Sequence, residues 1–238
     1  MIPIDGDYTL PLKKTGVATA AFLIATTACL DADEQACTND AMIVFDGSGS
    51  MAEMGFNDID EPRIFDARRA VAKAIPDVAL NRRIGLLIYG PGGADGCSGI
   101  DLRFPPIPNA APRVLEAVDT LEPAGETPLT VAVGEAAKTL KETSGAGSIV
   151  LVTDGKETCG GQPCQLATAI AGSNVIIHVI GFKVRGEYFS WEDQSDYGQA
   201  ETVSRCLAET TGGLYLNTET VDELIAAFRK TLGCNTLF

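Results

Sequence analysis

The chain has 238 residues, 45% of them hydrophobic and 6% aromatic, which is enough for one large α/β domain with a mostly aliphatic core. Asp and Glu outnumber Lys and Arg by 32 to 18, giving a formal net charge of −14. This charge argues against a nucleic-acid-binding protein, because phosphates require a basic face.

The first 28 residues have the pattern of an export signal. Lys13 and Lys14 precede an apolar run over 16–28, which is too short to span a bilayer as a mature helix. Cleavage before Cys29 would leave a thiol for lipid attachment, as in bacterial lipoproteins, and cleavage nearby without lipidation is the alternative. We expect a signal peptide over 1–28, a polar linker over 29–37 and an exported protein, either in the cell envelope or secreted. Membrane contact is expected only through lipid on Cys29.

The cysteine content agrees with export. The chain has seven cysteines, and setting Cys29 aside as a lipid site leaves six, an even number that can form three disulfides. These six are Cys37, Cys97, Cys159, Cys164, Cys206 and Cys234. They allow 15 pairings, so their number alone does not select one. A zinc clip at Cys159 and Cys164 is disfavoured because no second cysteine pair lies nearby.

Alternating apolar runs and amphipathic segments predict strands and helices in turn. In chain order we first predict a strand over 41–45, a helix opened by Glu61 and Pro62, strands over 83–89 and 100–104, a helix ending at Leu121 and a helix over 129–140. These are followed by a strand over 148–153, a helix over 163–171, a strand over 175–181, a polar insertion over 183–199, a helix over 200–210 and a strand over 214–217. The capping-box spacing of Thr220 and Glu223 opens a last helix. In the first helix the predicted inward face comprises Phe65, Val71, Ile75 and Val78. In the last helix it comprises Val221, Leu224, Ile225 and Phe228.

This order predicts a doubly wound α/β fold. Strands that alternate with helices form a mostly parallel sheet with helices on both faces. The short connection between 83–89 and 100–104 makes these two strands an antiparallel pair. The runs 41–45 and 148–153 are almost continuously apolar, as buried central strands should be. We therefore predict one domain over 38–234, followed by a short tail over 235–238.

Three polar segments follow predicted strands or lie on a crossover, and together they predict a cation site. The sequence Asp-Gly-Ser-Gly-Ser over 46–50 follows the first strand, Gly-Glu-Thr-Pro occupies 125–128, and Thr-Asp-Gly occupies 153–155. The carboxyl ends of parallel strands meet in one crevice, so these segments should converge there. The predicted ligands are Asp46, Ser48, Ser50, Thr127 and Asp154. Two carboxylates and three neutral hydroxyls suit Mg²⁺, which takes six oxygen ligands at about 2.0–2.1 Å, with Mn²⁺ and Ca²⁺ as the alternative ions.

These segments resemble the metal-ion-dependent adhesion site of the von Willebrand factor type A domain, the family that includes the integrin inserted domain. The resemblance covers nearly the whole mature chain and all five ligand positions. With strands numbered along the chain, it implies a six-stranded sheet of order 3-2-1-4-5-6 with strand 3 antiparallel. It also implies that the hydroxyls bind metal directly, that one or both Asp act through water, and that one coordination position stays open for a partner's Asp or Glu carboxylate. Cys97, the run 157–164 and Cys206 are similar to a bacterial exported branch of this family.

The resemblance predicts a binding module rather than an enzyme: an exported protein that captures an acidic side chain of a partner protein through Mg²⁺. A metal-dependent hydrolase is one alternative, and a structural envelope protein with a loop-stabilising cation is another. No Lys follows the Gly-rich loop as a P-loop requires, and Ser48 stands where a haloacid-dehalogenase-like phosphatase needs a second Asp. The one histidine, His178, lies within a predicted strand, which disfavours it as a catalytic base.

Two further features are expected near the metal face. The insertion over 183–199 follows a strand, and its Tyr188, Phe189 and Trp191 would form either a partner-binding rim or a self-packed loop.

The cysteines near the strand ends are the second feature. The expected positions of the elements favour the pairs Cys97–Cys159 and Cys164–Cys206, with a third pair, Cys37–Cys234, joining the ends of the domain. A local bridge between Cys159 and Cys164 is a competing arrangement. Either arrangement would hold the loops at the metal end of the sheet.

Overall fold

The computed structural model describes residues 39–54, 61–155, 157–182 and 204–233. Several predicted features lie outside the described residues: the signal peptide, the linker, the tail, Cys29, Cys37, Cys234, Tyr188, Phe189 and Trp191. No helix in the described part of the chain is long and apolar enough to cross a membrane.

The core of the domain is a six-stranded sheet in the order β3-β2-β1-β4-β5-β6. Its strands are β1 (Ala41–Asp46), β2 (Ile84–Tyr89), β3 (Ile100–Ile107), β4 (Gly147–Thr153), β5 (Val175–Phe182) and β6 (Tyr215–Thr218). β3 pairs with β2 in antiparallel fashion, and the other neighbours are parallel. The predicted strand order and the antiparallel third strand are confirmed.

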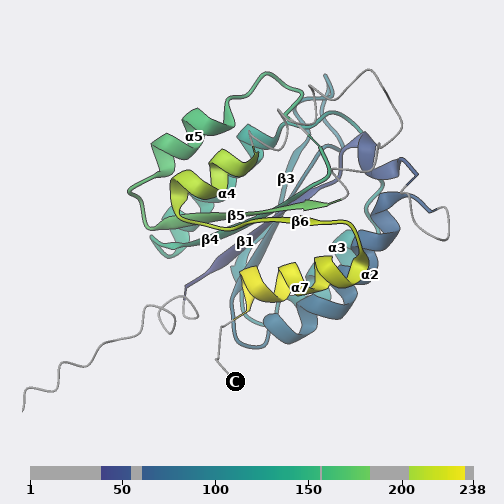
Figure 1. The fold of residues 1–238 in the computed structure, drawn as a ribbon, viewed down its shortest axis with the longest axis horizontal. Coiled ribbons are helices and arrows are strands. Elements are labelled where there is room, and N and C mark those ends of the chain that lie inside the picture. The colour runs from purple at the N-terminus through teal and green to yellow at the C-terminus, as the bar shows by residue number, and fades with distance from the viewer. Residues whose placement is uncertain (1–38, 55–60, 156, 183–203, 234–238) are drawn as a thin grey trace, which may run out of the picture. The chain divides into compact units, whose positions relative to one another are not determined.

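Helices cover both faces of the sheet, with α4 and α5 on one side and α2, α3 and α7 on the other (Figure 1). The described helices are α2 (Arg63–Val78), α3 (Ala111–Asp119), α4 (Leu129–Thr143), α5 (Pro163–Ile170) and α7 (Val221–Leu232), together with a 3-10 turn, η1 (Gly49–Ala52). Residues 204–211 are also helical. The doubly wound arrangement matches the prediction.

β1 is one of the two central strands, and all six of its residues are buried. Ile43 and Phe45 pack into the apolar cluster beneath α2 and α7, whereas Met42 and Val44 pack into the cluster beneath α4. A strand buried on both faces requires a continuous apolar run, which explains its sequence. Its last residue, Asp46, is therefore carried by one of the most firmly packed elements of the domain.

One predicted inward side chain, Phe65 of α2, is in fact 40% exposed. The neighbouring Ile64 is the buried residue, at 3% exposure. Ile64 precedes Val71 by seven residues, which is almost two full turns, so the two side chains lie on the same face of the helix. Phe65, the next residue along the helix, lies off that face. The Phe65 ring instead contacts the guanidinium of Arg68, whose Cζ lies 5.2 Å from the ring centroid.

The start of α7 has the predicted capping box. The Thr220 hydroxyl accepts a hydrogen bond from the Glu223 backbone N–H at 3.2 Å, and a Glu223 carboxylate oxygen accepts one from the Thr220 backbone N–H at 3.2 Å. This reciprocal pair satisfies two N–H groups at the helix start, which would otherwise be left unbonded.

Candidate metal centre

Asp46 and Asp154 stand at the carboxyl ends of two neighbouring strands. Asp46 is the last residue of β1, and Asp154 directly follows β4. Because β1 and β4 are adjacent and parallel, their ends meet at the same edge of the sheet. The backbone N–H of Asp154 accordingly lies 3.4 Å from Oδ2 of Asp46.

Four of the five predicted ligand side chains form one continuous chain of hydrogen bonds. Oδ1 of Asp46 accepts from the Ser48 hydroxyl at 2.5 Å and from the Ser48 backbone N–H at 2.9 Å. The hydroxyl oxygens of Ser48 and Ser50 lie 3.0 Å apart. The Ser50 hydroxyl then donates to Oδ1 of Asp154 at 2.7 Å. Residues 104 positions apart are thus joined through their side-chain oxygens.

Thr127, the fifth predicted ligand, lies beside this chain but is not part of it. It is 5% exposed, and its backbone N–H donates to the Thr158 hydroxyl at 2.8 Å. Two residues earlier, the carbonyl of Gly125 accepts from the backbone N–H of Gly49 at 3.0 Å, which brings this segment against the 46–50 loop. Within the described ranges, no hydrogen bond joins the Thr127 hydroxyl to the other four side chains.

Each of the two carboxylates directs one oxygen toward the serines, and the other oxygen is held by the protein. Oδ2 of Asp46 accepts from the Tyr89 hydroxyl at 2.7 Å and from the Thr153 hydroxyl at 2.9 Å. Oδ2 of Asp154 accepts from Nη1 of Arg63 at 3.0 Å. These partners fix the orientation of both carboxyl groups, as outer-shell groups do for metal ligands.

Sequence reasoning missed these three supporting residues. Tyr89 ends the predicted strand over 83–89, but its contact with Asp46 depends on the register between β1 and β2, which the sequence does not encode. Thr153 lies next to the predicted ligand Asp154, so its hydroxyl could have been included in the predicted site. Arg63 carried no signal in the sequence, because its contact with Asp154 depends on how α2 packs against the end of the sheet.

The site concentrates negative charge where water is excluded. Asp46 is fully buried and Asp154 is 6% exposed. Burial, with the neighbouring charge of Asp46 as the second cause, raises the pKa of Asp154 to about 7, although Ser50 and Arg63 act in the opposite direction. Burial, assisted by Asp46, also raises the pKa of Tyr89 well above its usual range, so Tyr89 stays a neutral donor. Two buried carboxylates this close are stabilised by a cation.

The loops that carry these residues approach one another at glycines. Gly125 has a φ of +78°, and a Cβ at this position would clash with the carbonyl oxygen of Gly90. Gly90 in turn has a φ of +106° and lies against the backbone of Ser48. A side chain at either glycine would force the loops apart.

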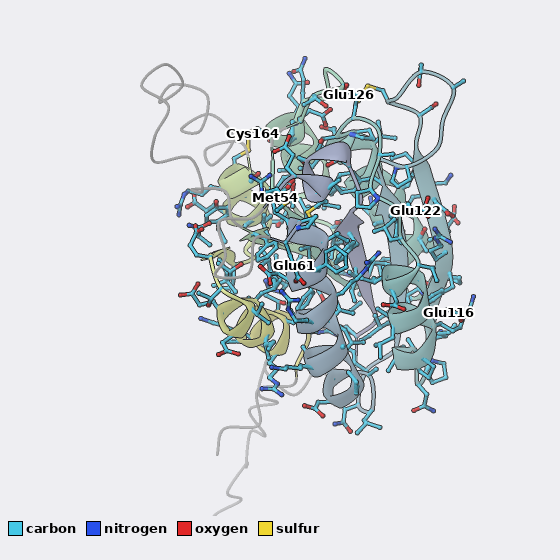
Figure 2. All side chains as sticks on the ribbon, turned by 90° about the vertical axis from the view of Figure 1, so that its right-hand side faces the viewer. Met54, Glu61, Glu116, Glu122, Glu126 and Cys164 are labelled. Atoms are coloured by element: carbon cyan, nitrogen blue, oxygen red, sulfur yellow. A yellow bond between two sulfur atoms is a disulfide. The ribbon has the colours of Figure 1, made fainter. Side chains whose placement is uncertain are left out.

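Two disulfides tie the surrounding loops, and both are pairs that the sequence analysis favoured. Cys97–Cys159 joins the loop after β2 to the loop after β4, and Cys164–Cys206 joins the first turn of α5 to the helical segment 204–211. The competing local bridge between Cys159 and Cys164 does not form. Cys164 and Glu126, which is exposed, lie toward the same end of the domain in Figure 2.

Comparison with known proteins identifies the family. Residues 41–157 match the family described as von Willebrand factor type A domain. The protein carries a von Willebrand factor type A domain. Its relative YwmD of Bacillus subtilis (strain 168) is 29% identical over 210 residues, which cover 84% of this chain and 87% of YwmD.

Solved structures with this fold come from diverse sources. A von Willebrand factor type A protein from Catenulispora acidiphila has a TM-score of 0.58 at 18% identity, covering 82% of this chain and 42% of that one. The pilus adhesin SpaC from Lactobacillus rhamnosus GG has a TM-score of 0.61 at 12% identity, covering 82% of this chain and 30% of SpaC. Proximal thread matrix protein 1 from the mussel byssus, with a zinc-occupied MIDAS motif, has a TM-score of 0.50 at 16% identity, covering 83% of this chain and 46% of that one.

The donor set of the von Willebrand factor type A domain fits a hard divalent cation. Its candidate ligands all present oxygen, from two carboxylates and three hydroxyls, and oxygen is the ligand atom that Mg²⁺, Mn²⁺ and Ca²⁺ take. Across the described residues, no three His, Cys, Asp or Glu side chains form a group that could hold a metal ion by themselves. A cation at this site would therefore depend on the serine and threonine hydroxyls.

His178 takes no part in the candidate metal centre of the von Willebrand factor type A domain. It pairs in register with Val150, in the middle of β4 and well before the strand end. Its Nδ1 accepts a hydrogen bond from the Leu214 backbone N–H at 3.1 Å. Burial, with Arg82 as the second cause, lowers the pKa of His178 to about 4, so the ring is neutral at pH 7. It is a packed strand residue, as its sequence position predicted.

Proposed function

We propose that this protein is an exported, metal-dependent binding module that captures an acidic side chain of a partner protein through Mg²⁺, with Mn²⁺ or Ca²⁺ as the alternative ions. The proposed ligands are Asp46, Ser48, Ser50, Thr127 and Asp154. The observation that carries the proposal is the unbroken chain of side-chain oxygens from Asp46 to Asp154, in which each carboxylate keeps one oxygen for the cluster.

The residues around the site have distinct tasks in this proposal. When bound, the cation supplies a Lewis-acidic position that a partner's carboxylate oxygen can fill. Tyr89 and Thr153 hold Asp46 in orientation, and Arg63 does the same for Asp154. Because three of the five ligand groups are neutral hydroxyls, they neutralise little of the ion's positive charge, and the ion still attracts an anionic side chain.

The comparisons support an adhesion-type role. SpaC is a pilus adhesin, proximal thread matrix protein 1 is a protein of the mussel byssus, and the latter has a zinc-occupied MIDAS motif. The net charge of −14 supports a protein partner rather than nucleic acid. We extend the proposal to the domain boundaries: a signal peptide over 1–28, with Cys29 as a lipid site, a linker over 29–37 and the binding domain over 38–234. The two disulfides support an oxidising compartment outside the cytosol.

The deciding experiment is a pull-down from cell-envelope extract in Mg²⁺ and again in chelator. It compares the wild type with Asp46→Asn and with Asp77→Asn, an exposed carboxylate of α2 paired with Arg229, as the matched control. We expect a partner that is captured only in Mg²⁺, by the wild type and by Asp77→Asn but not by Asp46→Asn. Capture that persists in chelator would reject the mechanism.

Two other results would support the competing functions. Stabilisation by Mg²⁺ without any captured partner would favour a structural envelope protein with a loop-stabilising cation. Turnover of phosphate or ester substrates that is lost in Asp46→Asn would favour a hydrolase.

A further inference from the structure

Arg63 places a positive charge directly against the candidate metal centre. It is the first residue of α2 and is 9% exposed, and its Nη1 lies 3.0 Å from Oδ2 of Asp154. The side chain of Asp154 is itself fully buried, so little water screens this pair. The other polar neighbours of Nη1, the Ser50 carbonyl and a carboxylate oxygen of Glu53, are both at 3.4 Å. Among the described residues, Asp154 is thus the closest polar contact of Nη1.

The surroundings of Arg63 differ from those of a structural arginine in the same domain. Arg82, which is 8% exposed, uses its Nε, Nη1 and Nη2 to donate to backbone carbonyls and to the Ser148 hydroxyl. Nε of Arg63, in contrast, is buried and has no hydrogen-bond partner among the residues that the structure describes. Leaving a buried donor unpaired costs free energy, so the packing around Arg63 is not a site built to satisfy a guanidinium. Its pairing with Asp154 offsets this cost.

The charges at the site determine what Arg63 does to a bound ion. Ionised Asp46 and Asp154 carry two negative charges, which a divalent cation alone would neutralise. With Arg63 included, the loaded site keeps one positive charge in excess. Glu53 offsets this excess only weakly, because its side chain is 64% exposed and screened by water.

We propose that Arg63 is a tethered cation that lowers the affinity of the site for a divalent ion and leaves the loaded site positive toward an incoming carboxylate. The inference rests on the proposed function. In the free protein Arg63 compensates Asp154, and repulsion from its guanidinium weakens the hold on the ion. A partner's carboxylate supplies the missing negative charge, so the ion and the carboxylate bind more tightly together than either does alone.

The test titrates Mn²⁺ into the full chain and measures free Mn²⁺ by electron paramagnetic resonance. Arg63→Met removes the charge and keeps much of the apolar stem, Arg63→Lys keeps the charge, and Arg69→Met is the control for losing an arginine from the same helix. Arg69 pairs with Glu61 and Asp66, and among the described residues it makes no hydrogen bond or ion pair with the proposed metal ligands. Wild type, Arg63→Lys and Arg69→Met should agree within about two-fold. Arg63→Met should bind Mn²⁺ on the order of ten-fold more tightly, a low estimate for one charge a few ångström from a divalent ion.

A second measurement repeats the titration with acetate in place of chloride, acetate being the probe for a carboxylate. Acetate should tighten Mn²⁺ binding to the wild type more than to Arg63→Met. Equal or weaker Mn²⁺ binding by folded Arg63→Met would overturn the inference. If the methionine variant failed to fold, a ten-fold gain in Arg63→Lys would still overturn it. Failure of the proposed function would look different, because the wild type itself would then show no Mn²⁺ binding that depends on Asp46.

Discussion

Replacing Tyr89 by Phe tests whether the second oxygen of Asp46 matters to the metal centre. The Tyr89 hydroxyl is fully buried and donates to Oδ2 of Asp46 at 2.7 Å, leaving Thr153 as the other side-chain donor to that oxygen. A hydrogen bond to a charged group contributes about 1.5–3 kcal/mol to the free energy of unfolding. In chelator we therefore expect Tyr89→Phe to lose about 2 kcal/mol, which corresponds to a fall in Tm of about 4–8 °C for a domain of this size.

The same substitution should also weaken metal binding. Loss of an outer-shell partner of a metal ligand typically costs about 10–100-fold in metal affinity. The assay is urea unfolding in chelator together with Mn²⁺ titration of the folded protein. The control is Thr231→Val, which removes a buried hydroxyl that donates to the Ala227 carbonyl at 2.8 Å within α7. We expect the control to lose stability and keep its Mn²⁺ affinity. If Tyr89→Phe binds Mn²⁺ as the wild type does, the carboxylate does not need this support and the reasoning is refuted.

Three further perturbations test the fold around the site. Because burial lowers the pKa of His178 from 6.5 to about 4, the folded state binds fewer protons than the unfolded state between these values, and its stability falls as the pH falls through this window. Through this residue the wild type should therefore lose about 2 kcal/mol of unfolding free energy between about pH 7.5 and pH 5, and His178→Gln should not show this loss. Urea titrations of both proteins at the two pH values measure the difference. Replacing Cys97 and Cys159 by Ser opens a link across 62 residues and should lower the urea-unfolding free energy by about 4 kcal/mol; a loss under about 1 kcal/mol would contradict this. Gly125→Ala should weaken Mn²⁺ binding and lower Tm, whereas Gly145→Ala, which also has a positive φ but meets nothing within 4 Å, should lower Tm by less and leave Mn²⁺ affinity unchanged.

Much of the fold could be predicted because its strongest determinants are local. The runs 41–45 of β1 and 149–152 of β4 are continuously apolar, which marks central strands, and the short link between β2 and β3 favours an antiparallel pairing. The outward turn of Phe65 was not predictable in the same way. Two adjacent apolar residues, Ile64 and Phe65, compete for one face at the helix start, and the position of the first turn decides between them.

The residues of the candidate site also differ in whether local sequence or tertiary packing determines their position. Four of the five proposed ligands carry a local signature, because they end or directly follow strands that meet at one edge of the sheet, and Thr127 lies in a Gly-Glu-Thr-Pro turn on the crossover before α4. Tyr89 required the register between β1 and β2, and Arg63 required the packing of α2 against that edge. Contacts of this second kind depend on tertiary structure, and a single sequence contains no periodicity or spacing that encodes them.

The loops of the candidate site are bonded to one another as well as to their strands. These links join four different segments: Gly47 to Ala124 at 2.9 Å, Gly49 to Gly125 at 3.0 Å, Thr127 to Thr158 at 2.8 Å, and the disulfide between Cys97 and Cys159. A site held this way loses little further conformational entropy when a ligand binds. We therefore expect partner affinity to be governed by the ion and by the charges of Asp46, Asp154 and Arg63 rather than by closure of a loop. In kinetic terms, association should slow as salt screens the positive loaded site, and it should show no slow phase for rearrangement. A salt-independent association rate, or a slow phase that disappears when the Cys97–Cys159 bond is removed, would show that loop motion rather than charge controls binding.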